Sequence, residues 1–278
     1  MSPAMEPMRY LEYGGVAPAS SLDTAAALDY LRAKGFGDNP LEQSRDAIAR
    51  QTAAMLEFEP AGDDRCDFCG RPLMGGEFDR LRDGRQRCIT CSKTVVATHE
   101  EFVELFHEVR RNFEAIFELQ FRVGMTVRME NAKVIARQTS ERPRDAPGFD
   151  ARVLGFVRDS PSGYELFVEN GAPKLPTIWT LAHELTHIWQ YATWNRRAIL
   201  ARYGAANERY VFEGMASWAS IQYMFCTRET DFALRESLLT RLRNDEYGAG
   251  CRLFAARYPL RVRDTVLPDT PFEHALPL

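Results

Sequence analysis

The sequence predicts an α+β fold, because the spacing of its apolar residues changes twice along the chain. A helical period holds over residues 98–119, short β-rich runs follow from about 125 to 169, and a helical period returns from about 177 to 258. Ahead of these elements, four cysteines occur in two closely spaced pairs. We therefore expect a small cysteine unit, a helix, a small antiparallel sheet and then a group of helices.

The composition is that of a soluble globular protein and argues against two classes of partner. Of the 278 residues, 45% are hydrophobic and 27% are charged, which suits one sizeable domain with a small satellite. The net charge of −4 disfavours nucleic-acid binding, because phosphate contacts need a basic surface. No apolar run reaches membrane-spanning length and no signal peptide is visible, so we expect a cytoplasmic protein with no membrane partner.

Residues 1–62 predict an N-terminal helical segment. One helical patch begins at a capping Asp23 and stops near Gly35. A second opens with Asn39-Pro40, a cap followed by a proline at the first helical position, and is amphipathic. We interpret both patches as structural helices.

Residues 63–95 predict a separate four-cysteine unit. Cys66 and Cys69 form one Cys-x-x-Cys pair, and Cys88 and Cys91 form a second pair after eighteen intervening residues. Each pair lets one tight turn present two thiolates, and two such turns complete a tetrahedral zinc site. A cytoplasmic protein keeps its thiols reduced, which favours metal ligands over disulfides.

The residues between the two cysteine pairs predict a β-hairpin, as in zinc ribbons. Asp83-Gly84 is a two-residue hairpin signal between "FDRLR" and "RQR". A redox dithiol is the alternative, but it needs only one Cys-x-x-Cys pair. We predict one structural zinc ion with no open coordination position, in a unit that serves folding and contact with a protein partner.

The stretch "WTLAHELTHIW" predicts a second metal site on a helix. His183 and His187 are four residues apart and so lie on one helix face, with Glu184 turned toward a metal-bound water. An ordinary helix that carries two histidines is the alternative. The chain has only five histidines and the glutamate is in register, which favours the metal.

A third ligand is predicted on the following helix, "NERYVFEGMASWASIQYM". Its two candidate acids are Glu208 and Glu213. We choose Glu213, because it lies within the apolar run, where a carboxylate without a cation would be costly to bury. We expect Gly214 to leave room on the metal side. The pattern is then His-Glu-x-x-His-x25-Glu.

This ligand set predicts a catalytic zinc ion, in addition to the structural one. Zinc held by two histidines and a glutamate keeps one position for water, which becomes the nucleophile, with Glu184 as general base. A donor to the developing oxyanion is also needed, and several residues stay open for that role. These candidates are Tyr210, Tyr223, Tyr247 and His274. A second-shell acid is expected four residues after Glu213, but that position is Ser217.

Together these features are typical of a zincin-like metallopeptidase domain, over residues 96–278, that acts on protein or peptide substrates. In zincins the strand before the active-site helix often borders the cleft. We therefore expect an extended peptide to pair with that strand at Tyr164, Leu166 and Val168.

The chain from about Cys66 to Cys226 resembles the DA-one-type peptidases, ubiquitin-activated LIM-domain metallopeptidases of the gluzincin type. The motifs are "GAPKLPTIWTLAHELTHIW" and "FEGMASW". The resemblance implies zinc-dependent endopeptidase activity and ubiquitin or another protein as a partner of the zinc finger. With one four-cysteine site, like half a LIM domain, the chain resembles a compact bacterial-type member. The implied peptidase residues are His183, Glu184, His187 and Glu213.

Two other functions stay open. One is a zinc-finger adaptor in which the second metal site is not catalytic, although Glu184 has no purpose in such a site. The other is a zinc aminopeptidase, because "RMEN", Arg128 to Asn131, is similar to a segment with which some of these enzymes hold the substrate amine.

Overall fold

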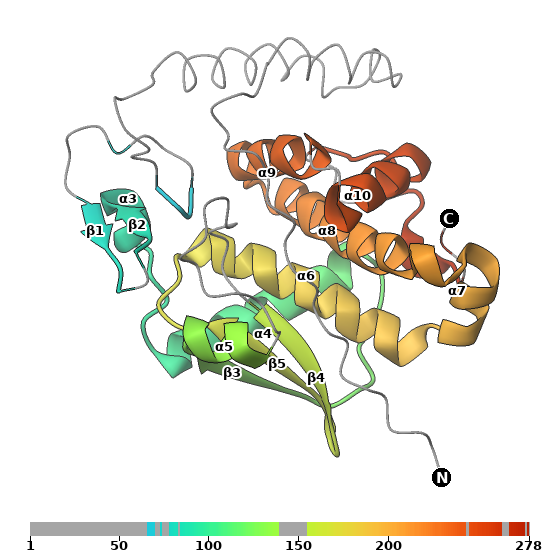
Figure 1. Cartoon of the computed structure of the whole chain (residues 1–278), viewed down its shortest axis with the longest axis horizontal. Coiled ribbons are helices and arrows are strands. Elements are labelled where there is room, and N and C mark those ends of the chain that lie inside the picture. The colour runs from blue at the N-terminus through green and yellow to red at the C-terminus, as the bar shows by residue number, and fades with distance from the viewer. Residues whose placement is uncertain are drawn as a thin grey trace.

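The structure is a computed structural model that describes residues 66–69, 73, 78–82, 84–138, 155–242, 245–262, 267–275 and 277. The helices predicted within residues 1–62 lie outside these described residues. Figure 1 shows a small cysteine unit at one end, a small sheet, and helices stacked above it. The predicted α+β class is confirmed.

The cysteine unit contains a hairpin of β1 (Phe78–Arg80) and β2 (Gln86–Cys88), followed by the short helix α3 (Ile89–Ser92). The predicted hairpin is confirmed, but its loop has three residues, not two. The Leu81 amide donates to the Arg85 carbonyl (2.7 Å), and the Gly84 amide donates back to the Leu81 carbonyl (3.0 Å). Gly84 has φ +91°, which suits the glycine that ends a three-residue hairpin loop.

The main sheet has the strand order β3 (Met125–Glu130), β5 (Gly163–Glu169), β4 (Gly155–Ser160). The pair β4–β5 is antiparallel, as predicted, but β3 and β5 run parallel. The prediction of an antiparallel sheet is therefore wrong for β3. The chain leaves β3 through a helix and returns through β4, so β5 can align with β3 in the same direction.

The run "KVIAR" lies within the stretch from about 125 to 169 in which we expected only strands, but it belongs to helix α5 (Ala132–Gln138). Asn131 explains the difference, because its side-chain oxygen accepts the Lys133 amide (2.9 Å) and so starts a helical turn. Ile135 of this helix packs with Phe156 and Phe167 on one face of the sheet. In so short an apolar run, the spacing of the apolar residues fits a strand and a helix equally well, so the sequence pattern alone could not distinguish them.

Helix α6 (Lys174–Thr193) carries the HELTH motif and lies in the middle of the molecule (Figure 1). It packs against β4 and β5 on one side and against α8 (Glu208–Cys226) on the other. Leu181, Leu185 and Ile188 are fully buried. Both its sides are therefore covered, one by the sheet and the other by α8.

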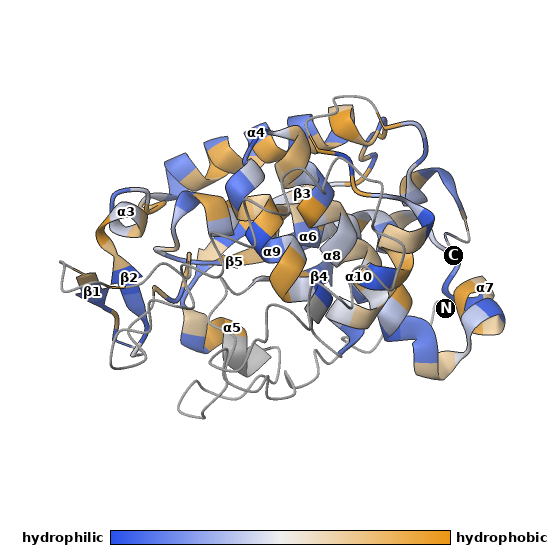
Figure 2. Ribbon diagram, turned by 90° about the horizontal axis from the view of Figure 1, so that it is seen from above, coloured by the Kyte–Doolittle hydropathy of each residue, from blue (hydrophilic) through white to orange (hydrophobic). Residues whose placement is uncertain are grey.

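Helix α4 (His99–Ile116) completes the core. Thr98 and Glu101 form the capping box at its start, which confirms a helix in the stretch expected from residue 98 onward. Apolar and polar residues alternate along α4 in Figure 2, and the apolar face packs on α6 and β3. The remaining elements are α7 (Arg196–Tyr203), η3 (Ala205–Asn207), α9 (Thr230–Leu242), α10 (Glu246–Arg257) and η4 (Pro271–Glu273).

Candidate metal centres

The four paired cysteines come together in one cluster. The sulfur atoms of Cys66, Cys69, Cys88 and Cys91 all lie within 4.8 Å of one another, and Sγ of Cys69 is 3.6 Å from Sγ of Cys88. Backbone amides also point at sulfur: the Cys88 amide lies 3.4 Å from Sγ of Cys66, and the Cys91 amide 3.5 Å from Sγ of Cys88. This arrangement could hold one metal ion with four protein ligands.

The protonation of this cluster supports a role in cation binding. Hydrogen bonds from the Cys69 and Cys91 thiols lower the pKa of Cys66, and the same shared protons raise the pKa of Cys91. Four sulfur atoms this close cannot all be thiolates unless a cation lies among them. Cys251 is different: it is fully buried, and burial raises its pKa to about 12.

The second candidate centre joins two helices. His183 and His187 of α6 and Glu213 of α8 place their ligand atoms within 4.8 Å of one another. Nε2 of His183 is 3.1 Å from Nε2 of His187 and 3.3 Å from Oε2 of Glu213. Two imidazoles and one carboxylate are a ligand set that could hold a metal ion with a position left open. Glu208, the other candidate acid, instead pairs with Arg196 at the surface.

At this centre the pKa values of His187 and Glu213 depend on each other's charge. Burial lowers the pKa of His187, but the carboxylates of Glu213 and Glu184 outweigh burial and raise it to about 9. Burial raises the pKa of Glu213, but the charge of His187 and hydrogen bonds from both histidines lower it well below its ordinary value. The two carboxylates therefore favour a positive charge at His187, either as a bound proton or as a metal ion that replaces it.

Gln190 orients the imidazole of His187, although Gln190 was not among the residues predicted from the sequence. Its Oε1 lies 2.8 Å from Nδ1 of His187, and its Nε2 donates to the Phe212 carbonyl (3.0 Å). The amide oxygen therefore accepts the Nδ1 proton and directs Nε2 toward His183 and Glu213. The available signal was its spacing, three residues after His187 on the same helix face. The predicted position for such a residue, Ser217, is buried on α8.

Replacing Gln190 with leucine is expected to weaken metal binding at this centre by about 10–100-fold, because His187 loses the group that fixes its tautomer. Competition with a chromophoric chelator measures this affinity. Gln190→Glu is the matched control, since a carboxylate can still accept the Nδ1 proton. If leucine and glutamate bind metal equally well, Gln190 does not orient His187.

Glu184 lies on the side of the centre that faces the sheet. Its side chain is 4% exposed. A Cβ added to Gly155 of β4 would lie 3.4 Å from Cγ of Glu184 and 2.5 Å from Cγ2 of Thr180, so only glycine lets β4 pass this close to α6. The edge strand β4 and Glu184 are therefore neighbours, as a general base and a substrate strand would need to be.

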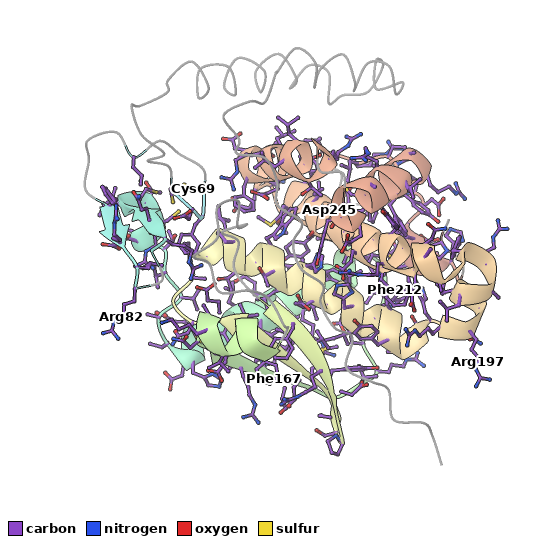
Figure 3. All side chains as sticks on the ribbon, in the orientation of Figure 1. Cys69, Arg82, Phe167, Arg197, Phe212 and Asp245 are labelled. Atoms are coloured by element: carbon purple, nitrogen blue, oxygen red, sulfur yellow. The ribbon has the colours of Figure 1, made fainter. Side chains whose placement is uncertain are left out.

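Of the four candidate oxyanion donors, the structure brings Tyr247 of α10 to the centre. Its ring stacks on His183 with centroids 6.0 Å apart. Helix α10 is capped by Asp245, which is labelled in Figure 3 and whose side chain accepts the Gly248 amide (3.0 Å). Tyr223 instead stacks on Phe113 in the core. His274 pairs with Asp269 near the C-terminal end, and no interaction in the described residues connects the Tyr210 side chain to the centre.

A glycine pair explains how α10 reaches this position. A Cβ on Gly214 would lie 2.4 Å from the Gly250 carbonyl carbon, so the backbones of α8 and α10 touch there. Tyr247 is one turn before Gly250 and is thereby carried beside His183. The expectation that Gly214 leaves room on the metal side is wrong: the room it leaves is filled by α10.

The predicted substrate strand is also wrong. Leu166 and Val168 are fully buried core residues on the α6 side of β5, and Tyr164 lies near Tyr191 (6.3 Å between centroids). Both edges of β5 are already paired, with β3 and with β4, so no peptide can add there. The sequence pattern identified a strand before α6 but not its place in the sheet.

The "RMEN" segment lies on the far edge of the sheet from β4. Arg128 is on β3 and pairs with Glu165 (3.2 Å), and Asn131 caps α5. The structure therefore does not bring these residues to the His183 centre, and it adds no support for an aminopeptidase.

Within the described residues, no helix has the length and apolar character needed to cross a membrane. Comparisons with protein-family models, with curated proteins and with solved structures found no match to this chain. Inferences about its function therefore depend on the geometry of the two centres.

Proposed function

We propose that this protein is a zinc-dependent peptidase with a zincin-like fold, related to the DA-one-type family. The observation that carries the proposal is the convergence of His183, His187 and Glu213, with Glu184 beside them, in a buried site between α6 and α8. Zinc bound there would polarise the scissile carbonyl and lower the pKa of water. The structural zinc would lie among the four cysteines.

Glu184 is the residue that would move the proton. It is not one of the three clustered ligands, and its carboxylate lies within the electrostatic reach of His187. A carboxylate in this position takes a proton from the attacking water and later delivers it to the leaving amine. Its burial beside β4 keeps bulk water from competing for that proton.

The edge strand β4 is the better candidate for pairing with substrate. Within the described residues β4 pairs on one side only, and it runs past Glu184. A peptide that adds along Gly155–Ser160 would lie over the metal centre and present a backbone carbonyl to it. Such backbone pairing favours an endopeptidase, because it does not need a free substrate amine.

Tyr247 is the proposed donor to the developing oxyanion. Glu184 lies on the sheet side of the centre and Tyr247 on the α10 side, so the base and the hydrogen-bond donor would approach a bound carbonyl from opposite sides. Tyr247→Phe is expected to lower kcat by about 10²–10³-fold with the metal retained. Steady-state kinetics and metal analysis test this. Tyr210→Phe, on α8 near the same helix crossing, is the control and should leave kcat unchanged. An unchanged kcat in Tyr247→Phe would assign the role to another group.

Two measurements together test the proposed function. Elemental analysis after gel filtration should find close to two zinc ions per chain, and close to one in His187→Ala. The intact protein should also cleave unfolded protein substrates, whether or not their N-termini are blocked. Two metal ions without cleavage would favour the zinc-finger adaptor. Cleavage that requires a free N-terminus would favour the aminopeptidase.

A further inference from the structure

The turn that leads into the metal-binding helix is held by the cysteine unit. This turn, residues 170–173, connects β5 to α6. The Val96 amide donates to the Ala172 carbonyl (3.0 Å), and the Lys174 amide donates to the Thr94 carbonyl (2.7 Å). Figure 1 shows the unit beside the first turn of α6. The chain directly after the cysteines is thus bonded to the end of the turn that leads into α6.

Two arginines of the hairpin strengthen this connection. Arg85 forms a two-pronged ion pair with Glu169, the last residue of β5, with Nη1 to Oε2 at 3.0 Å. The two side chains are 5% and 4% exposed, so the pair is buried. Arg87 donates from Nη1 to the Gly171 carbonyl (2.9 Å). A bidentate arginine fixes orientation as well as distance, which a single contact cannot do.

The sulfur cluster controls where these arginines lie. Arg87 directly precedes Cys88, and the Thr94 amide donates to the Cys91 carbonyl (3.2 Å). The Asp67 amide, inside the first cysteine pair, donates to the Gln86 carbonyl (2.9 Å). Metal at the cysteines would therefore order β2 and the segment after it, both of which contact the turn.

A shift of the turn at residues 170–173 would change the geometry of the second centre. His183 is nine residues after Lys174, or about 14 Å along α6 at the rise of a helix. The histidines move with α6, whereas Glu213 belongs to α8. A shift of the first turn of α6 would therefore change the distance from the histidines to Glu213.

We propose that Arg85 and Arg87 are positioning residues through which metal at the four-cysteine cluster raises the metal affinity of the His183–His187–Glu213 centre. The coupling makes the cysteine unit a regulator of this centre as well as a folding unit. It rests on the metal-binding part of the proposed function and does not require hydrolysis.

The test compares three variants of the full chain with the four-cysteine cluster loaded. Arg85→Met with Glu169→Leu removes the ion pair and leaves no lone buried charge. Arg87→Ala is milder, because Arg87 is partly exposed and loses its contact with Gly171. Arg82→Ala is the matched control: Arg82 belongs to the same hairpin and points away from the molecule in Figure 3.

Zinc affinity at the second centre is measured by competition with a chromophoric chelator, with His187→Ala to assign the signal. We expect the first two variants to bind zinc there at least about fivefold more weakly, and Arg82→Ala to be unchanged. Cobalt absorption from thiolate ligands checks that the cysteine cluster stays loaded. If the folded variants bind zinc at the second centre as tightly as the unmodified chain, the proposal is overturned. If Arg85→Met with Glu169→Leu does not fold, the result for Arg87→Ala alone decides the test.

A reciprocal measurement separates coupling from simple loss of structure. Linkage requires that zinc at the second centre raises the affinity of the cysteine cluster by the same factor. This increase is expected in the unmodified chain and should shrink in the Arg87→Ala variant. Its absence in the unmodified chain would also overturn the proposal. Coupling without any peptide cleavage would leave the inference intact and contradict only the peptidase function.

Discussion

Replacing Glu184 with glutamine is expected to reduce peptide cleavage by about 10²–10⁴-fold and to leave both metal centres filled. Glutamine keeps the volume of the side chain that packs beside Gly155, so the fold should not change. It cannot accept the proton of the attacking water, so only the chemical step is affected. Steady-state kinetics give the loss in kcat, and elemental analysis gives the metal content.

Glu208→Gln is the control for this experiment. Glu208 was the other acid considered on α8, and it pairs with Arg196 at the surface, so its loss should leave cleavage unchanged. Two results would contradict the role given to Glu184. Full activity in Glu184→Gln would mean that another group takes the proton. A loss of metal would mean that Glu184 is a ligand.

Replacing Gly214 with alanine is expected to destabilise the fold by about 2 kcal/mol or more and to weaken metal binding about tenfold or more. Alanine favours a helix by about 1 kcal/mol over glycine, which would stabilise α8 if the site had room. The new Cβ would instead lie 2.4 and 2.5 Å from backbone atoms of Gly250, which cannot rotate away. The helices must separate, and Glu213 is adjacent to the contact.

Thermal unfolding and chelator competition measure the two effects of Gly214→Ala. Gly204→Ala is the matched control, because Gly204 has φ +81° and nothing within 4 Å of an added Cβ. That variant should lose stability through backbone strain and keep its metal affinity. If both variants lose metal equally, the effect of Gly214→Ala is a general loss of stability and not a change in site geometry.

The residues that cluster at the two centres could be predicted because their placement follows from short-range periodicity. Residues four apart share a helix face, so "HELTH" places His183 and His187 together in any stable helix. The free-energy cost of burying a carboxylate without a cation then favoured Glu213 over Glu208 as the third residue. The structure brings Glu213 to the two histidines. The two Cys-x-x-Cys pairs were recognisable for the same reason, since each pair is closed by one local turn.

Several features could not be predicted, because they depend on which segments meet. The parallel pairing of β3 with β5 places Leu166 and Val168 in the core and makes β4 the edge strand. "KVIAR" is too short for its period to exclude a helix, and capping by Asn131 decided the outcome. Gln190 is near His187 in sequence, but its second partner, the Phe212 carbonyl, comes from α8.

The α+β class, the four-cysteine cluster and the three residues that converge at the second centre could all be derived from the sequence, because they depend on local turns and one helix period. Only the tertiary structure decided that Gly214 brings α10 and Tyr247 to this centre, and that Arg85 binds Glu169 of the sheet. Such contacts join residues dozens of positions apart. They arise from the packing of complete elements, which no local pattern of apolar residues specifies.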